Sequence, residues 1–198
     1  MGEVLLVGSA NRKKAEELSA LLQGLAWEVR NLHDYPTVAE PEETGATFEE
    51  NAVLKARYYS EAFHVPCLAD DSGLAVDVLG GAPGVYSARY AGPGAGDLDN
   101  RAKLLEALEG YLWHERTARF ICHAAFCRPG EPVHLEHGSV GGHISMEPFG
   151  TGGFGYDPVF VPSGYDRTFG EMDPAIKQEL SHRGQALKKI RVYLESLA

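Results

Sequence analysis

The sequence predicts an α/β fold with a mixed sheet flanked by helices, and three observations support this class. Short apolar runs alternate with stretches of helical periodicity along the chain. The composition, 44% hydrophobic and 23% charged, is typical of a soluble globular protein. A chain of 198 residues is long enough to bury one full-sized core, and no linker or repeat divides it. We therefore expect a single domain over residues 1–198.

The first half of the chain predicts a strand, a turn and two helices. Val4 to Val7 is a compact apolar run, and Lys13 to Leu22 follows it with an apolar face and an end near Gly24. Thr47 and Glu50 form a capping-box pattern that opens a second helix. The buried stripe of that helix comprises Phe48, Ala52, Ala56, Tyr59 and Phe63, whereas Asn51 and Lys55 share a polar face one turn apart.

The second half predicts further strands and two helices. Val65 to Ala69 reads as a strand that ends at Asp70, and a third apolar run covers Leu74 to Leu79. The later segments are a helix over Asp97 to Leu108, strands over Ala118 to Phe126, Val133 to Val140 and Pro158 to Val161, and a C-terminal helix from about His182.

Charge and cysteine content exclude several classes of protein. With 18 Lys plus Arg against 28 Asp plus Glu, the formal charge of −10 argues against a broad basic face for nucleic acid or anionic lipid. The three cysteines are an odd number and occur in apolar, strand-like contexts, which indicates a reducing, cytoplasmic compartment. No signal-peptide pattern and no apolar run of about 18 residues occurs, so we expect no membrane partner.

A basic segment lies where the first strand should end and the first helix begin. Its residues are Ser9, Ala10, Asn11, Arg12, Lys13 and Lys14. Backbone N–H groups and side chains at a helix N-terminus can converge on a phosphate. A plainer interpretation is an Asn helix cap beside two solvated lysines. The GxxxxGK[ST] string of a P-loop is absent.

Carboxylates gather at two places that suit a divalent metal. Asp70 and Asp71 follow the strand ending at Ala69, and Glu42 and Glu43 lie in the loop before Thr47. Mg²⁺ takes one or two carboxylates together with water and substrate phosphates. A solvated acidic loop is the alternative for the glutamates, and Asp77 is a weaker candidate. The cluster Cys122, His123 and Cys127 lacks the second ligand pair that structural zinc requires.

Two further segments favour recognition of a flat ligand. The string Gly150 to Asp157 contains a formal GxGxxG, but no helix follows, so the dinucleotide interpretation fails. Four glycines around Phe154 and Tyr156 suit close approach and stacking on a base, although a tight hairpin with a core Phe explains them equally well. In the last helix, His182 and Arg183 occupy a first turn where basic residues oppose the helix dipole.

Taken together, these segments resemble the inosine triphosphate pyrophosphatase family. The motifs SANRKK, EETGATFEENAVLKA, ADDSGLAVDVLGGAPGVYSARYAG, GTGGFGYDP and SHRGQAL occur in the family's order and spacing, from Val4 to about Leu194. Ser9 and Ala10 depart from the family's Thr-Gly-Asn turn but keep a hydroxyl and a small residue. The stretches at 113–117 and 128–133 carry no family motif.

The resemblance implies the fold, the reaction and the roles of particular residues. It implies an elongated domain of two lobes with a twisted mixed sheet, an active cleft between the lobes, and a homodimer. The implied reaction is Mg²⁺-dependent hydrolysis of ITP, dITP or XTP to the monophosphate and pyrophosphate, with water attacking the α-phosphorus. Asp71 would be the general base and, with Glu43, a metal ligand. Substrate-binding residues would be Ser9, Ala10, Asn11, Arg12, Lys13, Lys14, Lys55, Ser72, Phe154, Gly155, Tyr156, Asp157, Lys177, His182 and Arg183.

Base selection can be argued from the donor groups. A cationic donor such as Arg183 can donate to the 6-keto oxygen of hypoxanthine or xanthine, whereas the 6-amino group of adenine presents a donor to a donor. Guanine also has a 6-keto group, so its rejection needs an obstacle that the sequence does not locate.

Two alternative functions stay open on the sequence alone. One is a nucleotide-binding sensor that performs no chemistry. The argument against a sensor is the presence of Asp71, Glu43 and Lys14. The other is a pyrophosphatase of the related septum-inhibitor type. That group has a Ser/Arg-rich N-terminal motif, and the SANRKK segment of this chain does not match it.

Overall fold

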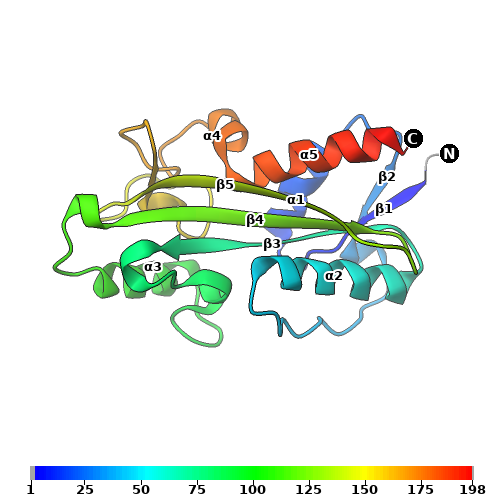
Figure 1. The fold of residues 1–198 in the computed structure, drawn as a ribbon, viewed down its shortest axis with the longest axis horizontal. Helices are drawn as coiled ribbons and strands as arrows, with labels where there is room; N and C mark the ends of the chain where they lie inside the picture. The colour runs from blue at the N-terminus through cyan, green and yellow to red at the C-terminus, as the bar shows by residue number, and fades with distance from the viewer. Residues whose placement is uncertain (1–2, 198) are drawn as a thin grey trace. The chain divides into compact units, whose positions relative to one another are not determined.

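The computed structural model describes residues 3–197. It contains one six-stranded sheet, and helices occur between and after its strands in the sequence (Figure 1). The strands are β1 (Val4–Val7), β2 (Glu28–Asn31), β3 (Cys67–Val76), β4 (Thr117–Cys127), β5 (His134–Ile144) and β6 (Phe160–Pro162). The α-helices are α1 (Arg12–Leu21), α2 (Phe48–Phe63), α3 (Asp97–Ala107), α4 (Pro174–Leu180) and α5 (His182–Ser196). Short 3₁₀ turns join several of them.

The sheet is mixed, as the sequence predicted. Its strand order is β2-β1-β3-β4-β5-β6. β1 pairs in parallel with β2 and with β3, whereas β5 and β6 are antiparallel. The connection from β1 through α1 to β2 is therefore a crossover between parallel neighbours, which leaves the loop after β1 at the carboxyl end of a buried strand.

The chain divides into two compact units. Unit 1 contains residues 1–71, 122–138 and 183–198, and unit 2 contains residues 72–121 and 139–182. The chain passes from one unit to the other within β3, β4 and β5 and at the start of α5. The sequence predicted one domain with two lobes and no linker; three shared strands are the reason that no linker composition is seen.

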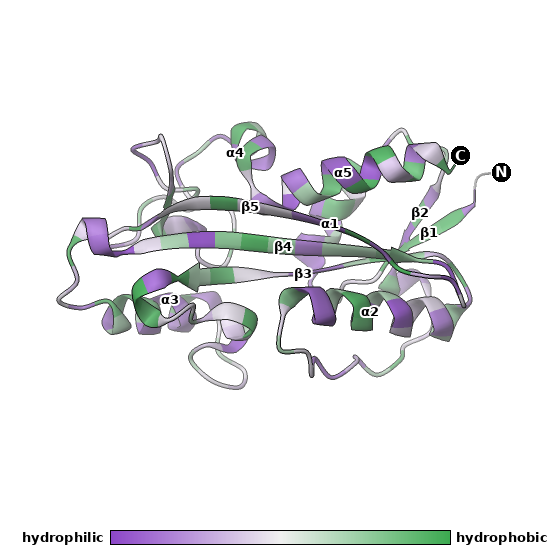
Figure 2. Cartoon of the chain, in the orientation of Figure 1, coloured by the Kyte–Doolittle hydropathy of each residue, from purple (hydrophilic) through white to green (hydrophobic). Residues whose placement is uncertain are grey.

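Unit 1 has an apolar core on each face of its strands. Leu5 and Val7 of β1 and Leu68 of β3 pack with α1 and α5, whereas Leu6 of β1 and Cys67 of β3 pack on the opposite side with α2. This alternation is the period of two expected when both faces of a strand are covered. Apolar and polar residues alternate along α2 (Figure 2), as expected of a helix with one buried face.

Unit 2 has its own core around Phe120, Phe160 and Phe169, whose rings contact one another. Leu104 of α3 and Tyr156 belong to the same cluster. The buried guanidinium of Arg116 donates to the backbone carbonyls of Leu108 and Tyr111, which follow α3, and of Ser145, which follows β5.

Several element predictions differ from the structure. β2 and α4 were not predicted, and Pro158 and Val159, predicted as strand, lie in a 3₁₀ turn before β6. The strand predicted to end at Ala69 continues through Asp70 and Asp71 to Val76, because both carboxylates find buried cationic partners and need not leave the sheet. Asp77 lies in a 3₁₀ turn rather than a strand. At the start of α2 the Thr47 hydroxyl accepts from the Glu50 N–H, but the Glu50 carboxylate accepts from Ala46 instead of completing the box. No helix among residues 3–197 is long and apolar enough to cross a membrane.

Candidate functional site

Consecutive aspartates on β3 point to opposite faces of unit 1. Successive side chains of a strand alternate between the two faces of the sheet. Asp70 therefore follows Leu68 to the side of α1 and α5, and Asp71 follows Ala69 to the side of α2. The sequence predicted both carboxylates beside one another at a strand end; in the strand they serve two different sets of partners.

Asp70 is the centre of a buried ion-pair network. Its Oδ2 lies 3.3 Å from Arg183 Nε and 3.6 Å from Lys14 Nζ, and the Cys122 thiol lies 3.8 Å away. Burial by itself raises the pKa of this carboxyl, but the charges of Lys14, Arg183 and Lys55 outweigh it and leave the pKa of Asp70 well below its usual value. Asp70 is therefore a permanent anion that holds two cations in unit 1.

Asp71 has a different environment. Its Oδ1 lies 3.0 Å from Lys55 Nζ and its Oδ2 accepts from the Asn51 carboxamide at 3.2 Å. Lys55 also lies 2.9 Å from Glu43 Oε1. Burial raises the pKa of Asp71 above its usual value, with Lys55 and Lys14 opposing and Glu43 adding to the rise. A buried carboxyl with a raised pKa and a neighbouring polar network is typical of a general base.

The loop that carries Glu43 is fixed by Asn51. The Gly45 N–H donates to Asn51 Oδ1 at 2.8 Å, while the amide nitrogen of Asn51 donates to Asp71. A Cβ on Gly45 would lie 2.6 Å from Asn51 Oδ1, so only glycine permits this approach. Asn51 thus couples the acidic loop to β3. The available signal in the sequence for this role of Asn51, which was not predicted, is its spacing of one turn from Lys55 on the polar face of the helix.

The loop after β1 begins at a close contact and ends in a helix cap. A Cβ on Gly8 would meet Cys67 Sγ at 2.8 Å. Asn11 Oδ1 accepts from the Lys14 backbone N–H, so Asn11 caps the helix as expected if this segment were only a helix start. The Lys14 side chain is not solvated, however, because its ammonium lies 3.6 Å from Asp70 Oδ2. Ser9 is buried, whereas Ala10, Arg12 and Lys13 are exposed, and Arg12 pairs with Glu16 at 2.9 Å.

The carboxylates of unit 1 fit a hard divalent cation. Glu43 and Asp71 supply only oxygen donors, and both approach the single positive charge of Lys55. Mg²⁺ is usually bound by one or two carboxylates, water and substrate phosphates rather than by a complete protein cage. Within residues 3–197 no group of three or more His, Cys, Asp or Glu side chains is arranged to hold a metal.

Unit 2 holds the glycine and aromatic loop in a second polar cluster. Asp157 is buried, and its Oδ2 accepts from the Phe154 N–H at 2.8 Å and from Lys177 Nζ at 2.7 Å. Lys177 Nζ also lies 5.3 Å from the centre of the Phe154 ring. The loop, its carboxylate and Lys177 are therefore one assembly, and Phe154 is its half-buried aromatic member.

Other predicted base-binding residues have distinct surroundings. Tyr156 is buried in the core, and its hydroxyl donates to the Ser87 carbonyl at 2.8 Å. His182 is also buried in unit 2 and stacks on Phe120, with ring centroids 4.7 Å apart. Arg183 lies in unit 1 and pairs with Asp70 and, at 2.5 Å, with Glu17. Ser72 is half-buried on β3. The roles of these residues toward a base stay predictions.

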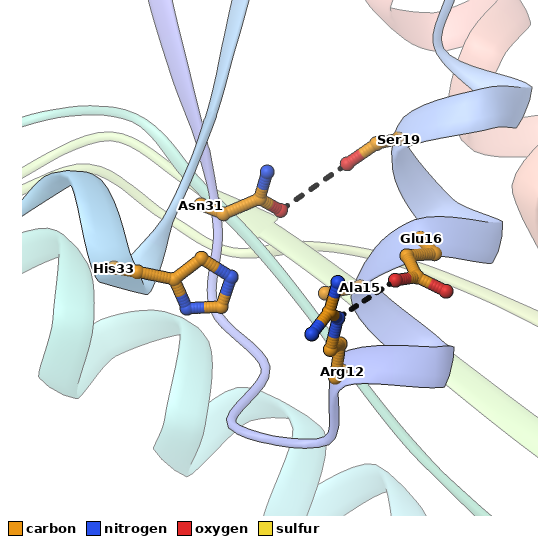
Figure 3. Close-up of a pocket in the computed structure, with 6 residues that line it drawn as sticks. All are labelled: Arg12, Ala15, Glu16, Ser19, Asn31 and His33. Atoms are coloured by element: carbon orange, nitrogen blue, oxygen red, sulfur yellow. Dashed lines mark hydrogen bonds and ion pairs between the residues drawn. The ribbon is translucent and has the colours of Figure 1, made fainter.

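A cavity of about 530 Å³ that the sequence did not indicate lies beside α1 in unit 1 (Figure 3). Its lining residues are Arg12, Ala15, Glu16, Ser19, Asn31 and His33. The Arg12–Glu16 ion pair and the hydrogen bond from Ser19 to Asn31 already join four of them, as the dashed lines show (Figure 3). It contains none of the buried carboxylates described above.

Comparison with known proteins gives a consistent result over nearly the whole chain. A family model described as the Ham1 family matches residues 5–193. Proteins named dITP/XTP pyrophosphatase from Bacillus licheniformis and Geobacter sulfurreducens are 48% and 47% identical. The first match covers 96% of this chain and 97% of the relative, and the second covers 96% of each.

Solved structures show the same fold. A HAM1 protein from Coxiella burnetii superposes with a TM-score of 0.90 at 41% identity and covers 99% of this chain and 100% of that one. A nucleoside-triphosphatase / dITP/XTP pyrophosphatase from Mycobacterium abscessus superposes with a TM-score of 0.79 at 43% identity, covering 94% and 98% of the two chains.

Proposed function

Because this chain belongs to the Ham1 family over residues 5–193, we propose that it hydrolyses non-standard purine nucleoside triphosphates, ITP, dITP and XTP, to the monophosphate and pyrophosphate. Relatives named dITP/XTP pyrophosphatase support the substrate class. The observation that carries the proposal is the arrangement of Glu43 and Asp71 around Lys55. It joins a base, a hard-cation donor set and a phosphate-binding cation within one unit.

The triphosphate would be held by Ser9, Asn11, Lys14 and Lys55. Lys14 and Lys55 are side chains at most one-sixth exposed, so their charges are screened less by water than charges on an open surface. Negative charge grows on the pyrophosphate as the bond to the α-phosphorus breaks. Cations fixed before the reaction stabilise that charge without reorganising.

Asp71 would act as the general base. In this step the carboxylate takes a proton from water while the water oxygen bonds to the α-phosphorus. The bond from the α-phosphorus to the bridging oxygen breaks, and pyrophosphate leaves with its electron pair. The raised pKa of Asp71 increases its capacity to accept the proton, and Asn51 fixes the direction of the carboxylate.

Glu43 and Asp71 are the residues that would hold Mg²⁺. A bound Mg²⁺ supplies charge neutralisation for the polyphosphate. Its proposed role rests on the oxygen-only donor set of these two carboxylates and on the resemblance. The chain itself keeps Lys55 paired with both carboxylates, which maintains the charge of the lysine. Burial lowers the pKa of Lys55, but Asp71, Asp70 and Glu43 raise it above its usual value overall.

The purine would be recognised by stacking and by donors to its 6-keto oxygen. Phe154 supports the stacking role, since it is the half-buried aromatic residue of the glycine loop. Gly155, Tyr156 and Asp157 would shape that loop, and Lys177, His182 and Arg183 would supply the donors. A 6-amino group would leave such donors without an acceptor, which can produce large discrimination.

The family resemblance also supports a homodimer and a cytoplasmic location. Neither follows from the contacts within one chain. Light scattering of the purified protein at micromolar concentration is expected to give twice the chain mass of 21.5 kDa, and a mass of one chain would contradict the dimer.

A panel of nucleoside triphosphates assayed with Mg²⁺ and with EDTA tests the proposal. We expect monophosphate and pyrophosphate in equal amounts from dITP and XTP, little product from dATP and dGTP, and no turnover with EDTA. Binding of dITP without product would indicate a sensor. A preference for dTTP or 7-methylguanine nucleotides would indicate the septum-inhibitor type. Release of inorganic phosphate instead of pyrophosphate would refute the assigned bond.

A further inference from the structure

The loop around Phe154 poses a conformational problem. Residues 150–155 include four glycines, and Gly150, Gly153 and Gly155 adopt positive φ. Glycine loses more conformational freedom on ordering than any other residue. A stacking residue in such a loop holds a useful orientation only if specific contacts restrain the backbone on both sides of it.

Crowding restrains the first part of the loop. A Cβ on Gly150 would lie 2.2 Å from the backbone of Gly170, and one on Gly153 would lie 2.1 Å from Asp157 Oδ2. These glycines pack against fixed neighbours. Gly155 differs, because no atom lies within 4 Å of a Cβ placed there. On that side of its Cα, packing therefore does not restrain Gly155.

Helix α3 holds Gly155 by both of its backbone polar groups, which belong to two successive peptides. The Gly155 N–H donates to Asp97 Oδ2 at 2.8 Å, and the Gly155 carbonyl accepts from Arg101 Nη1 at 2.6 Å. Asp97 and Arg101 lie four residues apart, so they project from the same face of the helix. The preceding peptide is held from another direction by Asp157, which accepts from the Phe154 N–H.

The helix itself is well anchored in unit 2. The side chain of Asn100 is buried, accepts from Ala91 N–H at 2.8 Å and donates to the Ala88 carbonyl at 3.1 Å. Leu104 is fully buried in the core cluster. The two side chains that hold Gly155 therefore extend from a rigid support.

We propose that Asp97 and Arg101 are positioning residues for base recognition: they hold the Gly155 peptide so that the Phe154 ring is ordered before substrate arrives. This inference deepens the proposed function and rests on it for the identity of the ligand. Ordering the loop in advance removes part of the entropy cost of binding. The contact with a base is the same in the ground state and the transition state, so its loss raises KM and leaves kcat nearly unchanged.

Substitutions at Asp97 separate the hydrogen bond from the charge. Asp97→Ala removes the acceptor for the Gly155 N–H, whereas Asp97→Asn keeps an acceptor oxygen and removes only the charge. We expect Asp97→Ala to raise the KM for dITP about 5- to 10-fold with kcat within about threefold. Asp97→Asn is expected to restore most of the loss, and Arg101→Ala to act like Asp97→Ala.

Asp99→Ala is the matched control on the same helix. Asp99 Oδ2 accepts from the Gly96 N–H at 2.9 Å and makes no contact with Gly155 in the described hydrogen bonds. Its loss weakens the start of α3 and is expected to lower the Tm by a few degrees while KM stays unchanged.

Hydrogen exchange of the amides in residues 150–157, measured without nucleotide, reports on the loop directly. We expect faster exchange in Asp97→Ala and Arg101→Ala and unchanged exchange in Asp99→Ala. Unchanged hydrogen exchange in both Asp97→Ala and Arg101→Ala would overturn the inference. A loss of kcat and Tm with KM unchanged in these variants would also overturn it. If the wild-type protein does not hydrolyse dITP, the proposed function fails, and the exchange rates still decide whether Asp97 and Arg101 order the loop.

Discussion

Two polar regions of this molecule are built in contrasting ways. In unit 1, Asp70 and Asp71 project from a buried strand and are held by charged partners from α1, α2 and α5. In unit 2, Phe154 and Gly155 lie in a glycine loop whose peptides are held by Asp97, Arg101 and Asp157. The first arrangement fixes charges, and the second fixes a backbone.

Under the proposed function, the contrast separates residues expected to act in catalysis from residues expected to recognise the base. Fixed charges at low exposure act on groups whose charge changes during a reaction, so substitutions of Asp70 and Asp71 should alter kcat, its pH dependence or stability. An ordered aromatic loop contributes binding that is equal before and at the transition state, so substitutions in unit 2 should alter KM and base preference.

The largest effect is expected for Asp71→Asn. An amide cannot accept the proton from water, so kcat should fall about 100- to 10,000-fold, while binding of dITP, measured by calorimetry, changes little. Asp166→Asn, at an exposed aspartate of unit 2, is the control and should keep wild-type kcat.

The pH profile of the wild-type enzyme provides a second check of that role. A base must be deprotonated to act, so kcat/KM should fall as the pH drops through the pKa of Asp71. Burial places that pKa above the usual aspartate value, so the acidic limb should lie at a higher pH than for an exposed carboxylate. Near-normal kcat in Asp71→Asn would remove the residue from the reaction.

Asp70→Asn tests whether the network of unit 1 is structural. Removing one member of a buried ion pair leaves the other charges uncompensated and costs about 3–5 kcal/mol in the free energy of unfolding. Asp77→Asn, which breaks the exposed pair with Arg119, should cost at most about 1 kcal/mol. Urea unfolding of both variants measures the difference.

The pH dependence of the Asp70 effect has a definite sign. The pKa of Asp70 is lower in the folded chain than in the unfolded one. Its contribution is therefore complete above the unfolded value of about 3.9 and is lost as the pH falls through the folded value. The gap between wild type and Asp70→Asn should be constant near neutral pH and narrow below about pH 4; equal stability at pH 7 would show that Asp70 is not a structural anion.

The smallest of these effects is expected for Phe154→Ala. Stacking of a base on an aromatic side chain is worth about 1–3 kcal/mol, so the KM for dITP should rise about 5- to 150-fold with little change in kcat. Phe149→Ala, at an exposed phenylalanine of the same unit, is the matched control. A fall in kcat at constant KM would end the division of roles between the two regions.

The sequence alone determined the fold class and most of the elements, although it indicated neither β2 nor α4. The strand at Val4–Val7, the helix with Asn51 and Lys55 on one face and the mixed sheet follow from local periodicity and capping, which depend on neighbouring residues. The motif order was enough to identify the family, which the comparisons confirm.

Only the tertiary structure decided how those residues are paired. That β3 runs on through two aspartates, that Asp70 faces Arg183 while Asp71 faces Lys55, and that Asp97 and Arg101 hold Gly155 all depend on contacts between distant segments. Local pattern cannot show such pairs, because the cost of burying a carboxylate is set by partners far away in the sequence.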